Sequence, residues 1–500
     1  MNPDVSSIGA VFSDVEQAEL SQSPLYNADL APVPDARRTW RAGSFAALWI
    51  SMAACIPTYM IASSLISGGM NWWEAVLTIF LANVIVLLPM LLNAHAGARY
   101  GIPFPVYCRA AFGTRGANVP ALLRALVACG WFGIQTWIGG EAIYKICVLL
   151  LGLHPAPVTN WLGISGGQLL CFLFFWGVNL AVIYQGINCI RWLLHIKAPL
   201  LILLGLSLLA WAYHRAGGFG PILEQPSAFA AGQPKAGHFF GFFFPALTGM
   251  IGFWATLSLN IPDFSRYAKT QRDQILGQSL GLPLTMALYS FIGVAVTSAT
   301  TLIYGQTIWD PVDVLTRFTN PVVLIIAMLA LCVATLATNI AANVVSPAND
   351  LAHLAPRLIS FRLGGFITAV LGLVMMPWKL VADPSGFIFN WLIAYSALLG
   401  PIGGILIADY FVIRRCRLNL PDLYRAEGEY RFSGGWSLVA LAALLAGIAP
   451  SLPGFIVQVH PAASAVVPAF FTQLYGYAWF IGFGVAFVVY LGLRPLAPRA

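Results

Sequence analysis

Charged residues are scarce in this chain of 500 residues: they make up only 9% of it, whereas a soluble domain carries roughly 25%. Hydrophobic residues reach 59%. Apolar runs of about 20 residues, the length that a helix needs to cross a bilayer, recur along the sequence. The composition therefore excludes a soluble globular protein and predicts an all-α polytopic membrane protein.

The apolar runs predict about twelve transmembrane helices. They lie near 43–67, 72–94, 120–151, 165–187, 196–214, 239–261, 275–304, 320–345, 363–381, 386–412, 436–458 and 466–493.

Motifs of catalysis and metal binding are also lacking. The eight cysteines show neither CxxC nor a paired spacing, which favours small core residues over a disulfide or zinc framework. There is no HExxH, no Ser/Lys or paired intramembrane Asp arrangement and no nucleotide-binding loop, so an intramembrane enzyme is not expected. The first apolar run follows about 40 polar residues that include acids, unlike a signal peptide.

The net charge of +7 reflects topology and not a nucleic-acid partner. With a cytoplasmic N-terminus and twelve spans, all but five of the 26 basic residues fall in cytoplasmic segments, as the positive-inside rule requires. No basic face or stacking motif for nucleic acid accompanies them. Both termini are therefore predicted to be cytoplasmic in the plasma (inner) membrane. The five exceptions are Lys145, Arg215, Lys235, Arg317 and Lys379.

Two predicted spans carry helix-breaking residues. Pro57 removes a backbone donor within the first span, and Gly249 and Gly252 weaken the centre of the sixth, which Pro262 ends. Interrupted helices at corresponding positions of two halves are typical of the binding sites of inverted-repeat transporters. Simple kinks without a binding role are the alternative.

Amide and indole groups occur well inside three apolar stretches, the third, sixth and eighth predicted spans. Trp131 and Gln135 are four residues apart on one helix face, Trp254 lies in the sixth span and Asn343 in the eighth. An amide in hydrocarbon is costly unless it is paired. Two indoles can sandwich a flat ring, and each amide offers both a donor and an acceptor. These residues predict a site for a small, flat, amide-like ligand, with packing and inter-helix hydrogen bonding as the alternatives.

Seven segments resemble the nucleobase–cation symporter-1 family, which includes bacterial hydantoin, allantoin and uracil permeases. The resemblance runs from about Asn27 to about Tyr430. It implies the LeuT-type fold, in which spans 1–5 and 6–10 are inverted repeats and substrate and cation lie between spans 1, 3, 6 and 8. The segments are NADLAPVPDARRTW (27–40), ALWISMAACIPTY (47–59), GIPFPVYCRAAFGTRGANVPALLRALVACGWFGIQTW (101–137), NIPDFSRYAK (260–269), LATNIAANVVSPAND (336–350), MMPWK (375–379) and GPIGGILIADYFVIRR (400–415).

The resemblance also implies a division of the chain. We expect a cytoplasmic N-terminal tail (1–42), a first inverted repeat (43–216), a second inverted repeat (239–412), two further spans (436–493) and a cytoplasmic C-terminus (494–500). The tail is expected either to pack under the cytoplasmic mouth or to be disordered.

The resemblance assigns roles in the substrate site. Trp131 and Trp254 match stacking indoles, and Gln135 and Asn343 match hydrogen-bonding amides. Further candidates are Cys55, Gly252, Phe253 and Asn339. Cys55 stands where the hydantoin-permease pattern has glutamine, and a thiol is a weak hydrogen-bonding group. This departure favours allantoin or uracil over a hydantoin.

The family's sodium site uses backbone carbonyls of spans one and eight and two hydroxyl groups of span eight. Thr338 retains one hydroxyl, whereas Ala337 occupies the position of the other. Losing a ligand should weaken the binding of a hard cation, so coupling to protons or weak coupling is the alternative. Glu141 is the best acidic proton carrier within a span, but Lys145 one turn later predicts a salt bridge instead. The carbonyl groups that match the sodium site are those of Ser51, Ala54 and Ala334.

Together, these features predict a secondary active transporter, not an enzyme. It would import a nucleobase-like ring, allantoin or uracil, by alternating access in symport with sodium or protons. Hydantoin, cytosine, purine or thiamine-like vitamin transport is the alternative within the family, and a channel or receptor-like protein is the alternative from another class. The expected partners are the ring, the coupling cation and the lipid bilayer, with no other cofactor and no nucleic acid.

Overall fold

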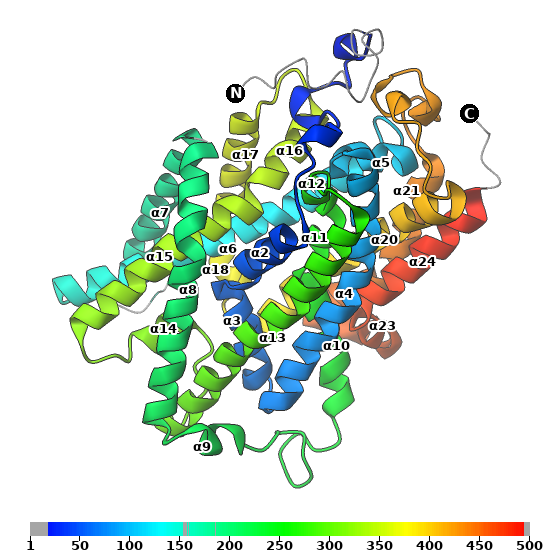
Figure 1. The fold of residues 1–500 in the computed structure, drawn as a ribbon. Coiled ribbons are helices and arrows are strands. Elements are labelled where there is room, and N and C mark those ends of the chain that lie inside the picture. The colour runs from blue at the N-terminus through cyan, green and yellow to red at the C-terminus, as the bar shows by residue number, and fades with distance from the viewer. Residues whose placement is uncertain (1–18, 154–157, 159, 186, 495–500) are drawn as a thin grey trace.

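The computed structural model describes residues 19–153, 158, 160–185 and 187–494 (Figure 1). Within these residues, the only β-type pairings are two isolated bridges, and helices form nearly all of the regular structure. The expectation of an all-α protein is therefore confirmed.

Seven helical segments of the described chain are long and apolar enough to cross a membrane, or up to nine if each of two bent pairs counts as one span. Three shorter apolar helices accompany them, and each of the twelve predicted segments falls on one of these elements. The long segments are α4 (Trp72–Tyr100), α6 (Asn118–Leu151), α7 (Gly166–Gln185), α13 (Gln271–Tyr304), α15 with α16 (Pro321–Leu354), Pro384–Ile413 around α20 (Ile393–Ile407), and Leu438–Val459, which contains α21 (Leu438–Ile448) and α22 (Leu452–Val459). The bent pairs are α2 (Ala42–Ala53) with α3 (Ile56–Ser67), and α23 (Ala469–Tyr475) with α24 (Ala478–Leu493); the shorter helices are Pro199–Arg215 of α8 (Ile187–Arg215), α10 (Phe239–Phe253) and Arg362–Val374 of α17 (Phe361–Val374).

The structure corrects the predicted end of the ninth span. α17 ends at Val374 and not at residue 381, and Met376 adopts a positive φ of 48°. Pro377 follows directly, and the residue before a proline is disfavoured in the helical region. The chain therefore turns here into the short helix α18 (Pro377–Leu380).

The predicted break in the first span is present. Cys55 between α2 and α3 is extended, with φ −152° and ψ 160°, and the two helix axes differ by 60°. Pro57 lies in the first turn of α3, where its missing N–H costs no helical hydrogen bond. The sixth span breaks likewise at Trp254, between α10 and α11 (Ala255–Asn260).

A third break separates α15 (Pro321–Asn343) from α16 (Val345–Leu354). Val344 leaves helical geometry there with φ −117°. The neighbouring sequence contains neither proline nor glycine until Pro347, so no local breaker signalled this break.

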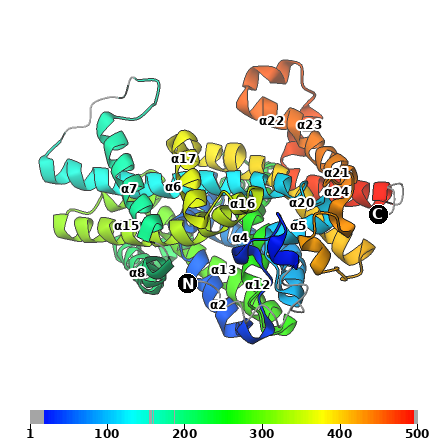
Figure 2. The same cartoon turned by 90° about the horizontal axis from the view of Figure 1, so that it is seen from above.

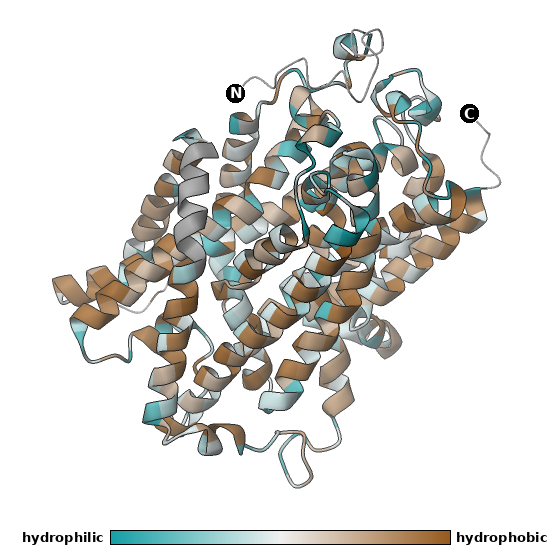
Figure 3. Cartoon of the chain, in the orientation of Figure 1, coloured by the Kyte–Doolittle hydropathy of each residue, from teal (hydrophilic) through white to brown (hydrophobic). Residues whose placement is uncertain are grey.

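The broken helices meet two long ones inside the bundle. α6 and α15 lie side by side in both views, and α13 packs against α2, α3 and α4 (Figures 1 and 2). Hydrophobic residues make up much of the helices, as their brown colour in Figure 3 shows. Leu88, Leu170 and Leu288 are 63%, 69% and 72% exposed, which suits contact with lipid and not with water.

Residues 19–41 pack against one end of the bundle, which we call the tail end. Leu30 is fully buried, and its carbonyl accepts a hydrogen bond of 2.8 Å from the hydroxyl of Tyr424. The backbone N–H of Val33 donates to the carbonyl of Gly101 at 2.9 Å. The described part of the N-terminal tail is therefore packed against the bundle, and its position at the cytoplasmic mouth stays a prediction, whereas residues 1–18 lie outside the described residues. The loop 414–437 lies at the same end (Figure 1).

Candidate substrate site at the helix breaks

A small cavity lies where the breaks of α2/α3 and α10/α11 face α6 and α15. Its volume is about 40 Å³, room for only a few water molecules at roughly 10–15 Å³ each. A flat ring therefore needs side chains to move apart before it fits, and the structure shows a closed state of the cavity. The lining residues are Met52, Cys55, Pro57, Trp131, Gln135, Phe253, Trp254, Thr256, Leu257, Thr338, Ala342 and Asn343.

Most of the predicted substrate residues therefore come together at one place, although α3, α6, α10 and α15 are far apart in sequence. Gly252 and Asn339 are not among the lining residues. A side chain at Gly252 would place its Cβ 2.7 Å from the carbonyl oxygen of Leu392. The glycine thus permits close approach of α10 to the segment before α20.

The aromatic residues of the cavity meet edge to face. The ring of Phe253 contacts Trp131 at 5.3 Å and 87°, and Trp254 at 4.8 Å and 74°. Trp49 of α2, which sequence analysis missed, packs edge-on against Trp254 at 5.2 Å. Because Phe253 touches both predicted indoles in this closed state, a ring sandwiched by Trp131 and Trp254 stays a prediction.

Two polar atoms of the cavity residues lack partners among the described residues. They are Oε1 of Gln135 and Nε1 of Trp254, and both side chains are about 5% exposed or less. A buried polar atom without a partner costs about 1–3 kcal/mol. A ligand with an N–H and a carbonyl would satisfy both atoms, because one is an acceptor and the other a donor. The thiol of Cys55 lies 3.2 Å from the hydroxyl of Thr58.

Asn343 reaches the cavity from the end of α15. Its Nδ2 donates to Oδ1 of Asn339 at 3.0 Å. Asn339 is fully buried one turn away, and its own Nδ2 faces protein acceptors on α6 and α7. Asn339 thus contacts the other candidate amide and lies behind the cavity.

The candidate cation ligands lie near the same cavity. Thr338 lines it, and its hydroxyl donates to the carbonyl oxygen of Ala334 at 2.9 Å. Ser51 lies in the last turn of α2, and Ala54 is its C-cap residue. Ala337 is buried and supplies no side-chain oxygen. This donor set suits a hard cation, with one hydroxyl fewer than the family pattern.

The predicted salt bridge between Glu141 and Lys145 is present, and a second pair lies at Asp409. Lys145 lies 3.4 Å from Glu141, and it also contacts Asp313 at 3.2 Å, which the sequence did not indicate. Arg414 pairs with Asp409 at 2.8 Å.

Asp263 is held by hydrogen bonds from two other helices. Its carboxylate accepts from the N–H of Phe104 at 2.9 Å and from the hydroxyl of Ser346 at 2.6 Å. The guanidinium of Arg266 donates to the backbone carbonyl of Asp29 at 3.0 Å. Asp263 thus ties α12 (Pro262–Ser265) to α5 (Phe104–Phe112) and α16.

Sequence analysis also missed a buried ion pair at the tail end. Arg124 of α6 and Asp350 of α16 are 2.5 Å apart, and both side chains are fully buried. Arg124 had been counted only among the basic residues that set topology. The pair joins two positions 226 residues apart, and no local pattern signals such a contact.

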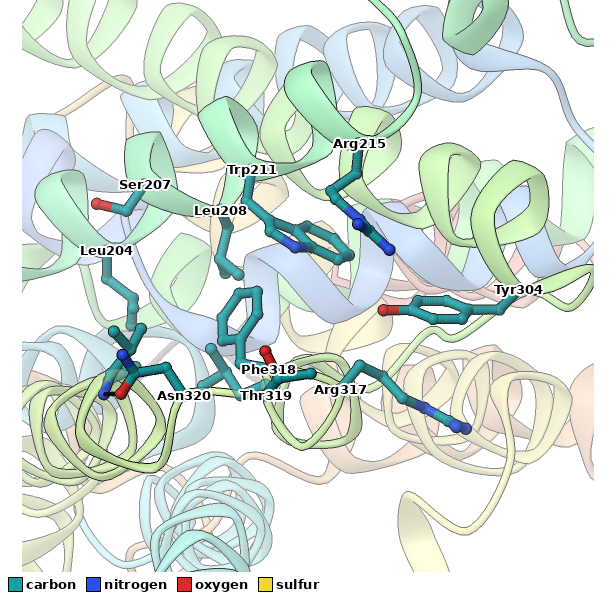
Figure 4. Close-up of a pocket in the computed structure, with 13 residues that line it drawn as sticks. Leu204, Ser207, Leu208, Trp211, Arg215, Tyr304, Arg317, Phe318, Thr319 and Asn320 are labelled. Atoms are coloured by element: carbon teal, nitrogen blue, oxygen red, sulfur yellow. Dashed lines mark hydrogen bonds between the residues drawn. The ribbon is translucent and has the colours of Figure 1, made fainter.

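A wider cavity lies elsewhere, between α8 and the start of α15. Its volume is about 420 Å³, and its lining includes Trp211, Arg215, Tyr304 and Arg317. Figure 4 shows Trp211 and Phe318 close together at its centre. It shares no lining residue with the cavity at the helix breaks, so we do not assign substrate binding to it.

Comparison with known proteins places this geometry in a family. Residues 32–482 match the family model described as permease for cytosine/purines, uracil, thiamine, allantoin. The chain is 46% identical over 473 residues to the purine-uracil permease NCS1 of Arabidopsis thaliana, covering 93% of this chain and 77% of that protein. It is 40% identical over 491 residues to the allantoin permease of Bacillus subtilis, covering 97% of this chain and 96% of that protein.

The solved structures of the transporter Mhp1 are similar along nearly the whole chain. Its inward-facing form gives a TM-score of 0.76 at 27% identity and covers 96% of each chain. Its closed form with bromovinylhydantoin bound gives 0.75 at the same identity, covering 94% of this chain and 96% of that one. These likenesses confirm the expected LeuT-type fold. The chain therefore belongs to the nucleobase–cation symporter-1 family of permeases, and it is a membrane transporter and not an enzyme.

Proposed function

We propose that this permease is a secondary active transporter that imports a small, flat, nucleobase-like ring, uracil or allantoin, across the inner membrane in symport with a cation. The names of its relatives support this range of rings, because one is a purine-uracil permease and the other an allantoin permease. Cys55, in place of glutamine, is the residue that favours these rings over a hydantoin.

The observation that carries the proposal is the polarity of the cavity at the helix breaks. Its lining combines indole, phenyl and amide groups, and it contains no Asp, Glu, Lys, Arg or His. An uncharged ring suits such a lining, because a charged ligand would be desolvated there without an ionic partner. The unpaired Oε1 of Gln135 and Nε1 of Trp254 then pair with an N–H and a carbonyl of the ring.

Alternating access follows from the position of the cavity. It lies inside the bundle at three broken helices, and in inverted-repeat transporters one repeat moves against the other around such a site. We propose the tail end as the cytoplasmic end, because most basic residues belong to the segments predicted on that side. The division into two five-helix repeats, residues 43–216 and 239–412, is part of the same proposal.

The identity of the coupling ion depends on the oxygens around Thr338. With Ala337 in place of a second hydroxyl, we propose weak sodium dependence, or coupling to protons. The glutamate within a span, Glu141, pairs with Lys145 away from the cavity, so we assign it no role in proton transfer.

Uptake of labelled uracil and allantoin into cells that express the protein tests the proposal. Each ring is measured with and without sodium, across external pH and after a protonophore, with unlabelled purine, hydantoin and thiamine as competitors. Saturable accumulation of one ring above its external concentration supports a symporter. Equilibration without accumulation indicates a channel, and absence of uptake or competition by any of these compounds contradicts the proposed substrate class.

A further inference from the structure

We infer that Asn339, held by Asn179 and Thr136, is a positioning residue that fixes the amide of Asn343 with its oxygen available to the ligand. The site then selects rings that present an N–H group to α15. The selectivity rests on the proposed function, whereas the orientation of the amides rests on the hydrogen bonds alone.

The orientation begins at a backbone carbonyl, which can only accept. Nδ2 of Asn179 donates to the carbonyl of Phe175 at 2.8 Å, so Oδ1 of Asn179 is the atom left to face α15. Nδ2 of Asn339 donates to that oxygen at 3.1 Å. Oδ1 of Asn339 in turn accepts from Nδ2 of Asn343 at 3.0 Å. Each amide therefore sets the direction of the next.

The amide of Asn339 has no second orientation of similar energy. Its Nδ2 lies 3.1 Å from three acceptors: the carbonyl of Phe132, the hydroxyl of Thr136 and Oδ1 of Asn179. Thr136 donates its own hydrogen to the carbonyl of Phe132 at 2.7 Å and therefore acts as an acceptor toward Asn339. A flipped Asn339 would bring its oxygen against these oxygens inside a fully buried site, where unpaired acceptors are costly.

The consequence lies at the cavity. Because Nδ2 of Asn343 is committed to Asn339, the planar amide turns Oδ1 away from Asn339 and leaves it as an acceptor for a ligand. Oε1 of Gln135 is a second acceptor, while Nε1 of Trp254 is a donor. The predicted ligand is therefore a lactam or imide ring with two N–H groups and a carbonyl, and a fully N-methylated ring is rejected.

Binding of uracil, 1-methyluracil, 3-methyluracil and 1,3-dimethyluracil to the purified protein tests the selectivity. The unaltered protein should bind uracil at least about tenfold more tightly than the dimethylated ring, since each lost hydrogen bond leaves a buried acceptor unpaired. In Asn339→Leu and Asn179→Leu this preference should fall below about threefold, because the amide of Asn343 is free to turn. Thr136→Val, which keeps the volume, should lower it less.

A matched substitution separates positioning from general loss of packing. Asn83→Leu also removes a buried asparagine within a span, but Asn83 donates only to the carbonyl of Ile79 on its own helix. It should lower the melting temperature at most and keep the preference for uracil. A preference unchanged in Asn339→Leu and Asn179→Leu, with folded protein confirmed by size-exclusion chromatography, overturns the inference. So does an unaltered protein that binds uracil and dimethyluracil equally.

A second measurement needs no ligand. Asn179 and Asn343 share no hydrogen bond, so a thermal-stability cycle of Asn179→Leu, Asn343→Leu and the double variant isolates coupling through Asn339. Non-additive shifts in melting temperature support the relay, and additive shifts contradict it. If no ring binds at all, the proposed substrate class fails while this cycle still decides the relay.

Discussion

Two buried polar regions that share helix α6 differ in what their side chains face. At the tail end, Arg124 of α6 meets Asp350 of α16, and both side chains are fully buried. Eleven residues further along α6, about 16 Å, Gln135 presents a neutral oxygen that has no partner among the described residues. Nε and Nη2 of Arg124 and Oδ1 of Asp350 also lack partners among the described residues. The two regions therefore differ in place: the charged pair joins α6 to α16, whereas Gln135 lines a cavity.

The tail end shows the same principle in a second cluster. Arg109 uses three nitrogens: Nε donates to Nε2 of His353 at 2.9 Å, Nη1 to the carbonyl of Leu423 at 2.8 Å and Nη2 to that of Leu25 at 3.1 Å. The guanidinium thus joins three segments distant in sequence. At the cavity, by contrast, Oε1 of Gln135 and Nε1 of Trp254 have no partner among the described residues.

Removing one charge of the buried pair should have the largest effect on folding. Arg124→Leu leaves Asp350 as a buried unpaired carboxylate, and we expect a loss of about 3–5 kcal/mol in the free energy of unfolding. Melting in detergent measures it. The double variant Arg124→Leu/Asp350→Leu should recover most of the loss, because no lone charge remains.

A matched control for this prediction is Arg425→Ala. Arg425 pairs with Glu19 at 3.0 Å on the exposed surface, and such pairs contribute at most about 1 kcal/mol. Equal losses for Arg124→Leu and Arg425→Ala would show that the buried pair does not hold the tail end together.

Gln135→Leu should lower transport and leave stability intact, the reverse of what we expect for Arg124→Leu. We expect uptake of the substrate ring to fall about tenfold or more, since one hydrogen bond to the ligand is lost. Stability should stay equal or rise, because the substitution removes a buried unpaired oxygen. Labelled uptake and melting temperature, compared on the same preparation, check both signs.

Gln278→Leu provides the control for Gln135. Gln278 of α13 is fully buried with an unpaired Oε1 but lies outside the cavity lining. Its substitution should leave uptake unchanged. If Gln135→Leu instead transports normally, or destabilises the protein as Arg124→Leu does, then the cavity is a structural polar region like the tail end.

The neutral region was largely predictable from the sequence, and the charged one was not. Pro57 marks a helix break by its own chemistry, and Trp131 and Gln135 share a face by their spacing of four. The motif matches then placed Trp254 and Asn343 at the same site. The pairing of Arg124 with Asp350 depends on how α6 and α16 pack, and no spacing within either helix reveals it.

The hydrogen bonds that hold Asn343 through Asn339 were also not predictable from the sequence. Thr136, Asn179 and Asn339 lie on three different helices, and each alone reads as an ordinary polar residue within a span. The break at Val344 has the same character, because no proline or glycine precedes it. Both the hydrogen bonds behind Asn343 and the break at Val344 depend on packing between helices. The motif gave the position of Asn343 but not the orientation of its amide.

Ala337→Ser adds one hydroxyl oxygen to the neutral region, at the candidate cation site beside Thr338. We expect stronger sodium dependence of uptake, by a few-fold in the ratio with and without sodium, because a hard cation gains a ligand beside Thr338. Ala341→Ser makes the same change on the same helix outside the cavity lining and should have no effect. Strict sodium dependence of the unaltered protein would contradict the weakened site.

The last test concerns Asp310 and has the smallest expected effect. Asp310 lies in a charged loop between α13 and α15, away from the tail end. Its carboxylate caps α14 (Pro311–Leu315) by accepting from the N–H of Val312 at 2.8 Å. Its pKa is raised to about 7: burial is the largest cause, the carboxylates of Asp313 and Glu141 also raise it, and the hydrogen bond from Val312 and the charge of Lys145 lower it.

The sign of the pH dependence follows from that raised pKa. The unfolded chain releases this proton near pH 4, whereas the folded protein keeps it up to about pH 7, so the free energy of unfolding falls as pH rises between these values. Asp310→Asn keeps a capping oxygen without the charge and should remove this slope. Asp383→Asn changes an exposed cap, which accepts from Gly386 at 2.8 Å, and should leave the slope intact. Equal slopes for Asp310→Asn and the unaltered protein, measured by melting at pH 5 and pH 8, would mean that Asp310 stays charged beside Lys145. Asp310 would then be a charged carboxylate paired with a cation, in the way that Asp350 of the tail end pairs with Arg124.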